Sequence, residues 1–358
     1  MRAFYTFAAS ILLAGSSIGI VQAADPSRKI VVAYGQPQPS TNIALGSSLP
    51  TYLKFWEQEG VEVELQMTPG ASAALQLVIA NKADVAVANA EAVMTAVQKG
   101  AAVKIVYTPT RGDIFGVALP AGEIKDLKGK TVGVSSFASG GYAYLRALLK
   151  QASLKLDEDT NAVEIGVGAR AAAAYQTKQV YALSLWDDQY AEFAERGIKF
   201  SQVVKDPRAS SGSVGSMVVR AEDVTKRRDA FIGFLRGIAK AQAFQKASAA
   251  ATIRVHWAVY PESKPRDGVT DASLASAVRV LLVREPYQDR NTMKTGNFGD
   301  VPRERFVEFQ DYLFETGQIT GKKDVENYFT NELIGEANKF DEPAIAALAK
   351  KLEQDPPR

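Results

Sequence analysis

Strand-like and helix-like segments alternate along the first part of this chain in two successive rounds. In the first round, short apolar runs at residues 29–34, 61–67, 85–88 and 103–108 alternate with helical patterns at 50–58, 71–81 and 90–99. In the second round, strands are predicted at 131–134, 163–167, 181–185 and 199–204, and helices at 139–151, 169–177 and 188–196. Strands separated by helices are typical of parallel sheets with helical crossovers. The pattern therefore predicts two α/β lobes.

After one more predicted strand at 216–220, the remainder of the chain is mainly helical. Helical patterns occupy residues 224–247, 273–283, 303–316, 331–338 and 343–352. Amphipathic helices must bury their apolar faces against another element. We therefore expect a helical C-terminal extension that packs on the lobes.

The first 23 residues have the composition of an export signal. Arg2 precedes an uncharged, apolar stretch, and Val21-Gln22-Ala23 places small residues where a signal peptidase cleaves. We expect cleavage after Ala23 and a periplasmic mature protein. The alternative is an uncleaved membrane anchor, but the Gly/Ser-rich centre of this stretch is a weak membrane span.

Charge, cysteine content and motifs exclude several classes of function. The chain has 42 basic and 40 acidic residues, which gives no reason to expect a nucleic-acid partner. It has no cysteine, so disulfides, thiol catalysis and Cys-ligated metals are excluded. Outside the predicted export signal there is no GxSxG motif, the chain has no HExxH or P-loop motif, and His256 is the single histidine. We therefore predict no catalytic residue, no metal and no cofactor.

A polar, glycine-rich turn at residues 135–141 connects a predicted strand to a helix. Ser139 can cap the helix, and Gly140 and Gly141 allow a ligand to approach the backbone closely. The unpaired N–H groups of a helix N-terminus can bind an oxyanion or another hydrogen-bond acceptor. The alternative is an ordinary capped helix start.

Similar loops follow several strands at the same predicted sheet edge, where ligands of open α/β sheets bind. The predicted ligand-binding residues are Gln38, Ser40, Thr41, Ser72, Asn89, Glu91, Ser135, Ser136, Phe137, Ser139, Gly140, Tyr142, Arg170, Trp186 and Asp187. Alternatives exist for four of them. Trp186 can be a core residue, Glu91 and Asp187 can cap their own helices, and Arg170 can be a surface charge.

Four stretches of the chain carry a resemblance to a known family. They are NKADVAVANAEAV (81–93), KDLKGKTVGVS (125–135), ALSLWDDQY (182–190) and ENYFTNELIGEANKFD (326–341). In this order they resemble the periplasmic solute-binding proteins of ABC importers. The branch is the one that contains sulfonate, taurine and nitrate binders and NMT1/THI5-like binders of thiamine-pyrimidine precursors. The chain departs from the family pattern at Lys178 and Tyr181, where Gly and Asp are usual, and at Asp188, where Pro is common.

The resemblance implies a type II periplasmic-binding-protein fold, in which two lobes joined by two crossover strands hold a solute between them. Lobe 1 would comprise residues 24–115 and 220–358, and lobe 2 residues 116–219, with crossovers at 116–120 and 215–219. The implied partners are a small-molecule solute and a membrane permease with its ATPase, and the protein would be a monomer. An exported sensor that presents its solute to a receptor is an alternative.

Two classes of solute fit the predicted loops. A sulfonate-like anion would use Ser139, Gly140 and Arg170, whereas an amino-bearing heteroaromatic such as a pyrimidine would use Glu91 and Asp187. We favour the anion narrowly, because carboxylates at helix starts more often cap their own helices. A more remote alternative is an enzyme that resembles the fungal pyrimidine synthase. That enzyme uses His and Cys-rich loops, which this chain lacks.

Overall fold

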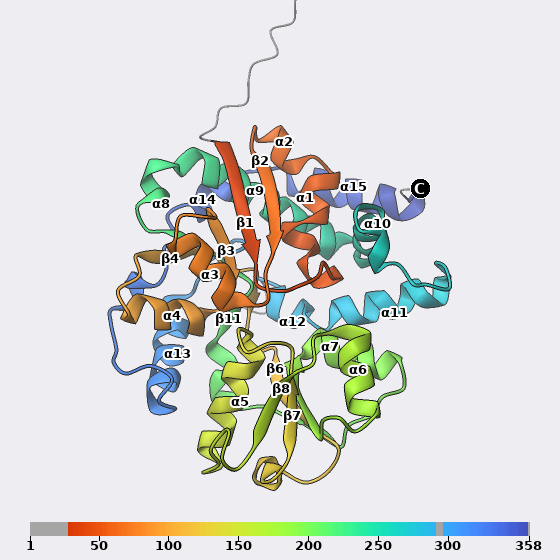
Figure 1. Cartoon of the computed structure of the whole chain (residues 1–358). Coiled ribbons are helices and arrows are strands. Elements are labelled where there is room, and N and C mark those ends of the chain that lie inside the picture. Colours follow the sequence, from red (N-terminus) through yellow and green to blue (C-terminus); the bar gives the residue numbers. More distant parts are fainter. Residues whose placement is uncertain (1–27, 291–295, 357–358) are drawn as a thin grey trace, which may run out of the picture.

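The computed structural model describes residues 28–290 and 296–356, and these form two α/β lobes, one above the other in Figure 1. The predicted cleavage site after Ala23 lies outside the described residues. Each lobe is built on a five-stranded sheet, and a separate two-stranded sheet is also present. No helix in the described part of the chain has the length and hydropathy that a membrane span needs.

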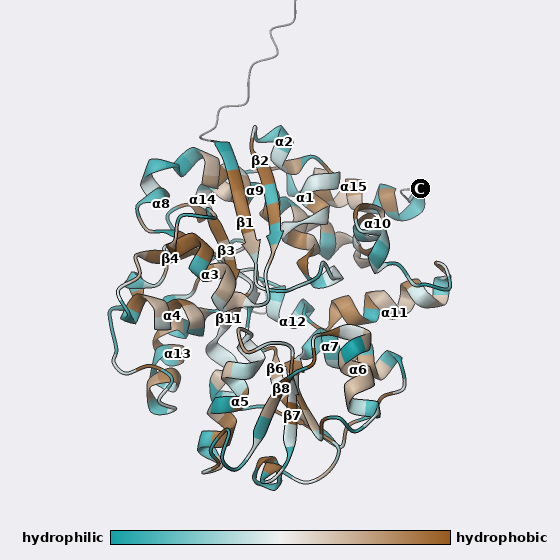
Figure 2. Cartoon of the chain, viewed as in Figure 1, coloured by the Kyte–Doolittle hydropathy of each residue, from teal (hydrophilic) through white to brown (hydrophobic). Residues whose placement is uncertain are grey.

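The first sheet has the strand order β2-β1-β3-β12-β4. Its strands are β1 (Lys29–Tyr34), β2 (Glu62–Met67), β3 (Val85–Ala88), β4 (Val103–Tyr107) and β12 (Ser216–Arg220). β1 pairs in parallel with β2 and β3, whereas β12 runs antiparallel between β3 and β4. The apolar residues of β1, β3 and β4 are visible in Figure 2, and all four residues of β3 are buried, as expected for a strand covered on both faces.

The second sheet has the strand order β10-β6-β9-β7-β8. Its strands are β6 (Phe115–Leu119), β7 (Thr131–Val134), β8 (Asn161–Glu164), β9 (Ala182–Trp186) and β10 (Gln202–Val204). β7 pairs in parallel with β8 and β9, whereas β6 runs antiparallel to β9 and β10. The two sheets therefore follow a similar plan, as the two rounds of alternation predicted.

Helices between the strands cover both sheets. In the first lobe they are η2 (Thr41–Gly46), α1 (Ser48–Tyr52), α2 (Phe55–Gln58), α3 (Ala71–Ile79) and α4 (Ala90–Gln98). In the second lobe they are η3 (Ile124–Leu127), α5 (Gly140–Gln151), α6 (Gly168–Gln176), α7 (Asp187–Glu195) and η4 (Pro207–Ser211). The single helix predicted at 50–58 is divided, because Lys54 adopts a left-handed conformation with φ of 57° between α1 and α2.

The chain passes between the lobes at two short strands. β5 (Thr110–Arg111) and β11 (Ser213–Val214) pair antiparallel with one another. The expected crossover segments, 116–120 and 215–219, instead overlap β6 and β12, which belong to the two main sheets. β6 and β12 are buried and hydrogen-bonded to neighbouring strands of these sheets, so at each of them the chain already lies within one lobe. The lobe boundaries themselves stay a prediction.

The C-terminal extension packs on both lobes. Its helices are α8 (Asp223–Lys226), α9 (Arg228–Ala247), α10 (Ala249–Val259), η5 (Pro261–Ser263), α11 (Asp271–Leu282), α12 (Glu285–Gln288), α13 (Arg303–Glu315), η6 (Val325–Asn327), α14 (Ile334–Ala337) and α15 (Glu342–Gln354). α9 buries Phe231, Phe234 and Leu235 in the core of the first lobe. α11 contacts α10 above it and α7 of the second lobe below it (Figure 1).

Candidate functional site

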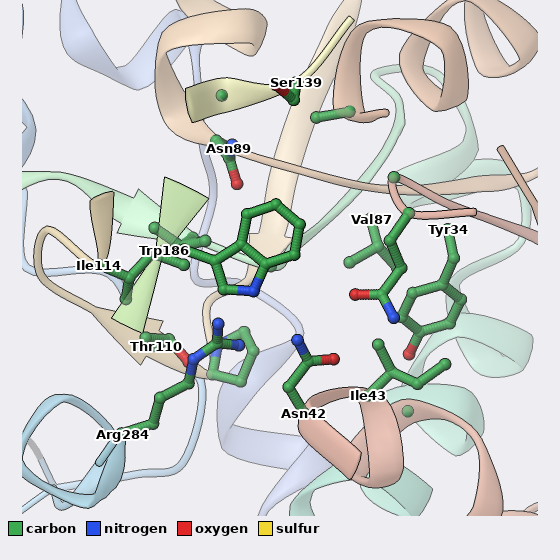
Figure 3. A pocket seen from close by; sticks show the side chains of 18 of the residues that line it. Tyr34, Asn42, Ile43, Val87, Asn89, Thr110, Ile114, Ser139, Trp186 and Arg284 are labelled. Atoms are coloured by element: carbon green, nitrogen blue, oxygen red, sulfur yellow. The ribbon is translucent and has the colours of Figure 1, made fainter. Parts of the chain in front are cut away.

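A cavity lies between the two lobes, at the carboxyl ends of their strands. We call it the central cavity, and Figure 3 shows it from close by. About 850 Å³ of space lies between its atoms, a figure that includes the open solvent at its mouth. Tyr34 and Asn89 come from the ends of β1 and β3, and Ser135 and Trp186 from the ends of β7 and β9. The cavity therefore lies at the sheet edge that the sequence predicted.

Most of the wall of the central cavity is apolar. The apolar and aromatic side chains that line it include Tyr34, Ile43, Leu45, Val87, Ile114, Phe115, Trp186, Val214 and Met217. In Figure 3 the indole of Trp186 lies at the centre, with Tyr34 and Val87 across from it. The Trp186 Nε1 atom is buried and has no hydrogen-bond partner among the described residues, so it is a donor available to a ligand.

One charged side chain, Arg284, lines the central cavity in the described part of the chain. Its Nε donates to Asp187 Oδ1 at 3.0 Å, and its Nη2 lies 3.1 Å from Asp188 Oδ2. Burial raises the pKa of Asp188 to about 6; the neighbouring Asp187 adds to this rise, while Arg284 opposes it. Arg284 is thus held in the cavity wall by two carboxyl groups of the second lobe.

Hydrogen bonds also join the two sheet-containing lobes around the cavity. Asn42 Nδ2 in the first lobe donates to Asp188 Oδ2 in the second at 2.6 Å. Ser136 Oγ donates to the Pro69 carbonyl at 2.7 Å, and the backbone N–H of Ser72 donates to the Ala138 carbonyl at 3.3 Å. The two lobes are therefore in contact in this structure, and residues of the 135–141 turn form part of that contact.

The glycines of that turn are explained by close packing at the start of α5. A Cβ added to Gly140 would lie 2.4 Å from Asn89 Nδ2 and 2.5 Å from Phe115 Cζ. A Cβ on Gly141 would lie 2.6 Å from the Ser184 carbonyl oxygen. Ser139 is the N-cap, as predicted, because its Oγ accepts from the Tyr142 N–H at 3.2 Å. Small residues thus bring the N-terminus of α5 to the cavity wall.

The structure distributes the predicted binding residues over three places. Those that line the central cavity are Asn89, Ser135, Ser139, Gly140 and Trp186. A second, open groove between α3, α4 and α5 is lined by Ser72, Glu91, Phe137 and Tyr142, and again by Ser139 and Gly140. The third group lines neither of these two cavities and consists of Gln38, Ser40, Thr41, Ser136, Arg170 and Asp187.

Local contacts explain several of these placements. Ser40 Oγ is hydrogen-bonded to Asn42 and Gln36. Arg170 is exposed at the surface. Asp187 lies in the first turn of α7 and pairs with Arg284.

Glu91 lies in the first turn of α4, where its Oε1 accepts from Asn89 Nδ2 at 3.3 Å. Burial raises the pKa of Glu91 to about 7, and the nearby Asp113 adds to the rise. Because Glu91 does not line the central cavity, its position is that of a carboxylate at its own helix N-terminus.

Sequence reasoning missed several residues of the cavity wall. Gln36 and Asn42 flank the predicted Gln38, Ser40 and Thr41, so the polar loop was identified but not its inward-facing members. Arg284 and Gln288 come from the segment around α12, far from the lobes in sequence. No local pattern there indicates a binding role. Within residues 28–290 and 296–356, no three His, Cys, Asp or Glu side chains are placed to share a metal ion.

Solved structures with a similar fold come from several organisms. A protein of Bordetella bronchiseptica RB50 is 20% identical with a TM-score of 0.68, covering 87% of this chain and 97% of its own. The alkanesulfonate-binding protein SsuA of Xanthomonas axonopodis pv. citri, solved with MOPS, is 16% identical with a TM-score of 0.61, covering 86% and 99%.

A Candida albicans gene product described as having the generic periplasmic-binding-protein fold is 15% identical with a TM-score of 0.60, covering 85% and 96%. These likenesses confirm the predicted two-lobe fold. A search of curated proteins found no match to the chain.

A family model places the chain more narrowly. The model described as NMT1/THI5-like matches residues 51–249, which is more than half of the 358-residue chain. The matched segment begins in α1, includes every strand of the two main sheets except β1, and ends at the first residue of α10. The chain therefore belongs to the NMT1/THI5-like family and has the fold of periplasmic binding proteins.

Proposed function

We propose that this protein is the extracytoplasmic solute-binding subunit of an ABC importer. It captures a small organic solute in the central cavity and delivers it to a membrane permease with its ATPase. The observation that carries this proposal is the cavity itself, whose walls come from both lobes, so that bound solute bridges them. A solute that contacts both lobes stabilises their closed arrangement, which is the form a permease can distinguish.

The solute class that fits the wall best is an organic anion with an apolar body, such as a sulfonate. Arg284 is the charged side chain at the wall, and the buried Nε1 of Trp186 and the backbone N–H of Gly140 at the start of α5 offer further donors. The apolar walls suit an alkyl or aromatic body. The similar fold of an alkanesulfonate-binding protein is consistent with this class.

An amino-bearing heteroaromatic is the second candidate. The aromatic faces of Trp186 and Tyr34 favour it, and the side-chain oxygens of Asn42 and Asn89 could accept from its amino group. The carboxylates that would suit it best, Glu91 and Asp187, do not line the central cavity. A pyrimidine-synthase-like enzyme has less support, because His256 is fully buried against Ser48 and does not line that cavity.

A thermal-shift screen tests both classes. Sulfonates, nitrate, pyrimidines and aromatic acids should be compared, because a ligand at one hundred times its dissociation constant adds about 2.7 kcal/mol to stability. For the anion we expect weaker binding in Ser139→Ala and equal or tighter binding in Glu91→Gln and Asp187→Asn. A tenfold loss in both carboxylate variants, with Ser139→Ala unchanged, would instead support the heteroaromatic.

Export is part of the proposed function. Mass spectrometry of the protein from the periplasm should find Ala24 at the N-terminus, since the predicted signal is cleaved after Ala23. A full-length product in the cytoplasm would contradict this proposal. Size-exclusion chromatography should find a monomer.

A further inference from the structure

The charges beside the central cavity do not balance. Asp187 and Asp188 both pair with Arg284, whose Nη2 lies 3.0 Å from Asp187 Oδ1 and 3.1 Å from Asp188 Oδ2. The side chains of all three are at most 11% exposed. With both carboxyl groups ionised, the cluster carries one net negative charge. An anion placed at Arg284 would therefore enter a region that is already negative.

The hydrogen bonds of the cluster are also incomplete. Asp188 Oδ2 accepts from Asn42 Nδ2 and lies beside Arg284, but Asp188 Oδ1 is buried without a partner among the described residues. Asp187 Oδ2 is in the same condition. A buried carboxylate oxygen without a donor is unfavourable, and a proton bound to one of these oxygens would remove both the charge and the unmet acceptor.

The groups that face Asp188 come from three elements. Asn42 belongs to η2, Arg284 to the segment between α11 and α12, and Asp187 and Glu192 to the same helix as Asp188. Arg284 is the one cation among them. An anion that hydrogen-bonds to Arg284 neutralises part of the positive charge that otherwise stabilises the Asp188 carboxylate. Asp188 is then surrounded by the negative charges of Asp187, Glu192 and the bound anion.

From this geometry we propose that Asp188 binds a proton when an anionic solute binds beside Arg284, so that the central cavity takes up the anion and a proton together. This inference rests on the proposed anionic solute class. Asp188 does not contact the solute in this proposal. By pairing with Arg284, it determines whether the cavity favours a charged or a neutral solute. A neutral solute of the same shape needs no proton.

The pH dependence follows from the sign of the effect. Burial already raises the pKa of Asp188 to about 6 in the free protein, and a bound anion raises it further because like charges disfavour ionisation. Below about pH 6 the free protein already holds the proton, and the affinity for the anion is highest and constant. Above that pH the affinity falls by up to about tenfold per pH unit. The fall ends where the pH exceeds the pKa of Asp188 in the complex.

Isothermal titration calorimetry of the full mature chain tests this inference. The probes are benzenesulfonate and propane-1-sulfonate, each paired with its neutral sulfonamide. Titrations at pH 7.5 in two buffers of different ionisation enthalpy give the number of protons exchanged. We expect uptake of up to one proton with each sulfonate and none with the sulfonamides. Titrations from pH 5.5 to 8.5 should show the fall in sulfonate affinity.

Two variants locate the proton. Asp188→Asn keeps an acceptor oxygen for Asn42 and removes the charge. It should bind sulfonate more tightly at pH 8 and without proton uptake. Glu195→Gln removes a carboxylate from the same helix, α7, at an exposed pair with Arg279, and should leave the proton uptake unchanged. If Asp188→Asn does not fold, the number of protons that the unmodified protein takes up with each sulfonate still tests the inference.

The contrary outcomes are distinct. Sulfonate binding without proton uptake, or an unchanged pH profile in Asp188→Asn, would overturn the inference and leave the proposed solute class standing. Failure of both sulfonates to bind at every pH would overturn the inference together with the anionic class. Loss of proton uptake in Glu195→Gln would place the proton elsewhere on α7.

Discussion

Asn42 of the first lobe donates to Asp188 of the second at 2.6 Å, across a sequence separation of 146 residues. This bond joins η2 to the start of α7, beside the central cavity (Figure 3 shows Asn42 next to Arg284). Because this bond joins residues of the two lobes, it would break if the lobes moved apart. It therefore contributes to the closed arrangement and not to the stability of either lobe alone.

Removal of this bond should weaken solute binding. A hydrogen bond to a charged group contributes about 1.5–3 kcal/mol, so Asn42→Ala should reduce affinity by roughly ten- to a hundredfold. Small-angle scattering should also show a larger radius of gyration for the variant than for the unmodified protein at the same solute concentration. Asn327→Ala, which removes an exposed Asn that bonds only to the Asp324 carbonyl, is the control. Equal affinity in Asn42→Ala would show that the contact does not favour closure.

Gly141 should tolerate no side chain. A Cβ there would lie 2.6 Å from the Ser184 carbonyl, a backbone atom of β9 that cannot move without disturbing the sheet. We expect Gly141→Ala to lower the free energy of unfolding by about 1–3 kcal/mol and to weaken solute binding, since α5 must shift away from the cavity. Gly335→Ala, in α14, meets no atom within 4 Å and should leave both quantities close to their original values. Chemical denaturation measures the first and calorimetry the second.

Trp186 should report solute binding by fluorescence. It lines the central cavity, whereas Trp56 and Trp257 are only 4% exposed and do not line it. A protein with Trp56→Phe and Trp257→Phe should retain the change in emission on binding, and Trp186→Phe should lose it. A change that persists in Trp186→Phe would place the solute away from this indole.

The partly buried carboxyl of Glu91, on the wall of the open groove between α3, α4 and α5, should make stability depend on pH. Burial raises its pKa from 4.5 to about 7, so the folded protein favours the protonated form more than the unfolded chain does. Stability is then greatest below about pH 4.5 and falls as the pH rises to about 7, with no further loss from this group above that. Glu91→Gln should remove this group's part of the dependence and stabilise the protein at pH 8, by less than about 3 kcal/mol because solvent in the groove screens the charge.

Denaturant unfolding at pH 5, 6, 7 and 8 measures the effect. Glu158→Gln is the matched control, since that carboxylate is 67% exposed. A slope in Glu91→Gln equal to that of the original protein would refute the assignment.

Features that depend on neighbouring residues could be predicted from the sequence alone. The β7–turn–α5 unit follows from the apolar run, the capping Ser139 and the glycines, all within a short stretch. The two-lobe architecture follows from the repeated alternation, because a parallel strand pair requires a crossover between its members. The edge that carries the cavity follows from the same rule, and so Asn89, Ser135 and Trp186 were placed on its wall.

Features that depend on contacts between distant segments were decided only by the tertiary structure. The passages between the lobes are set by the pairing of β5 with β11, whose residues are about a hundred positions apart, and neither has a local signal longer than two residues. Ser136 bonds to Pro69 of the other lobe and does not line the central cavity, a choice its own sequence neighbours do not specify. Arg284 reaches the cavity because α11 packs between α10 and α7 of the second lobe, and its charge is compensated by Asp187 and Asp188 from α7. The electrostatics of the site thus arise from the packing of the C-terminal segment, which no local periodicity encodes.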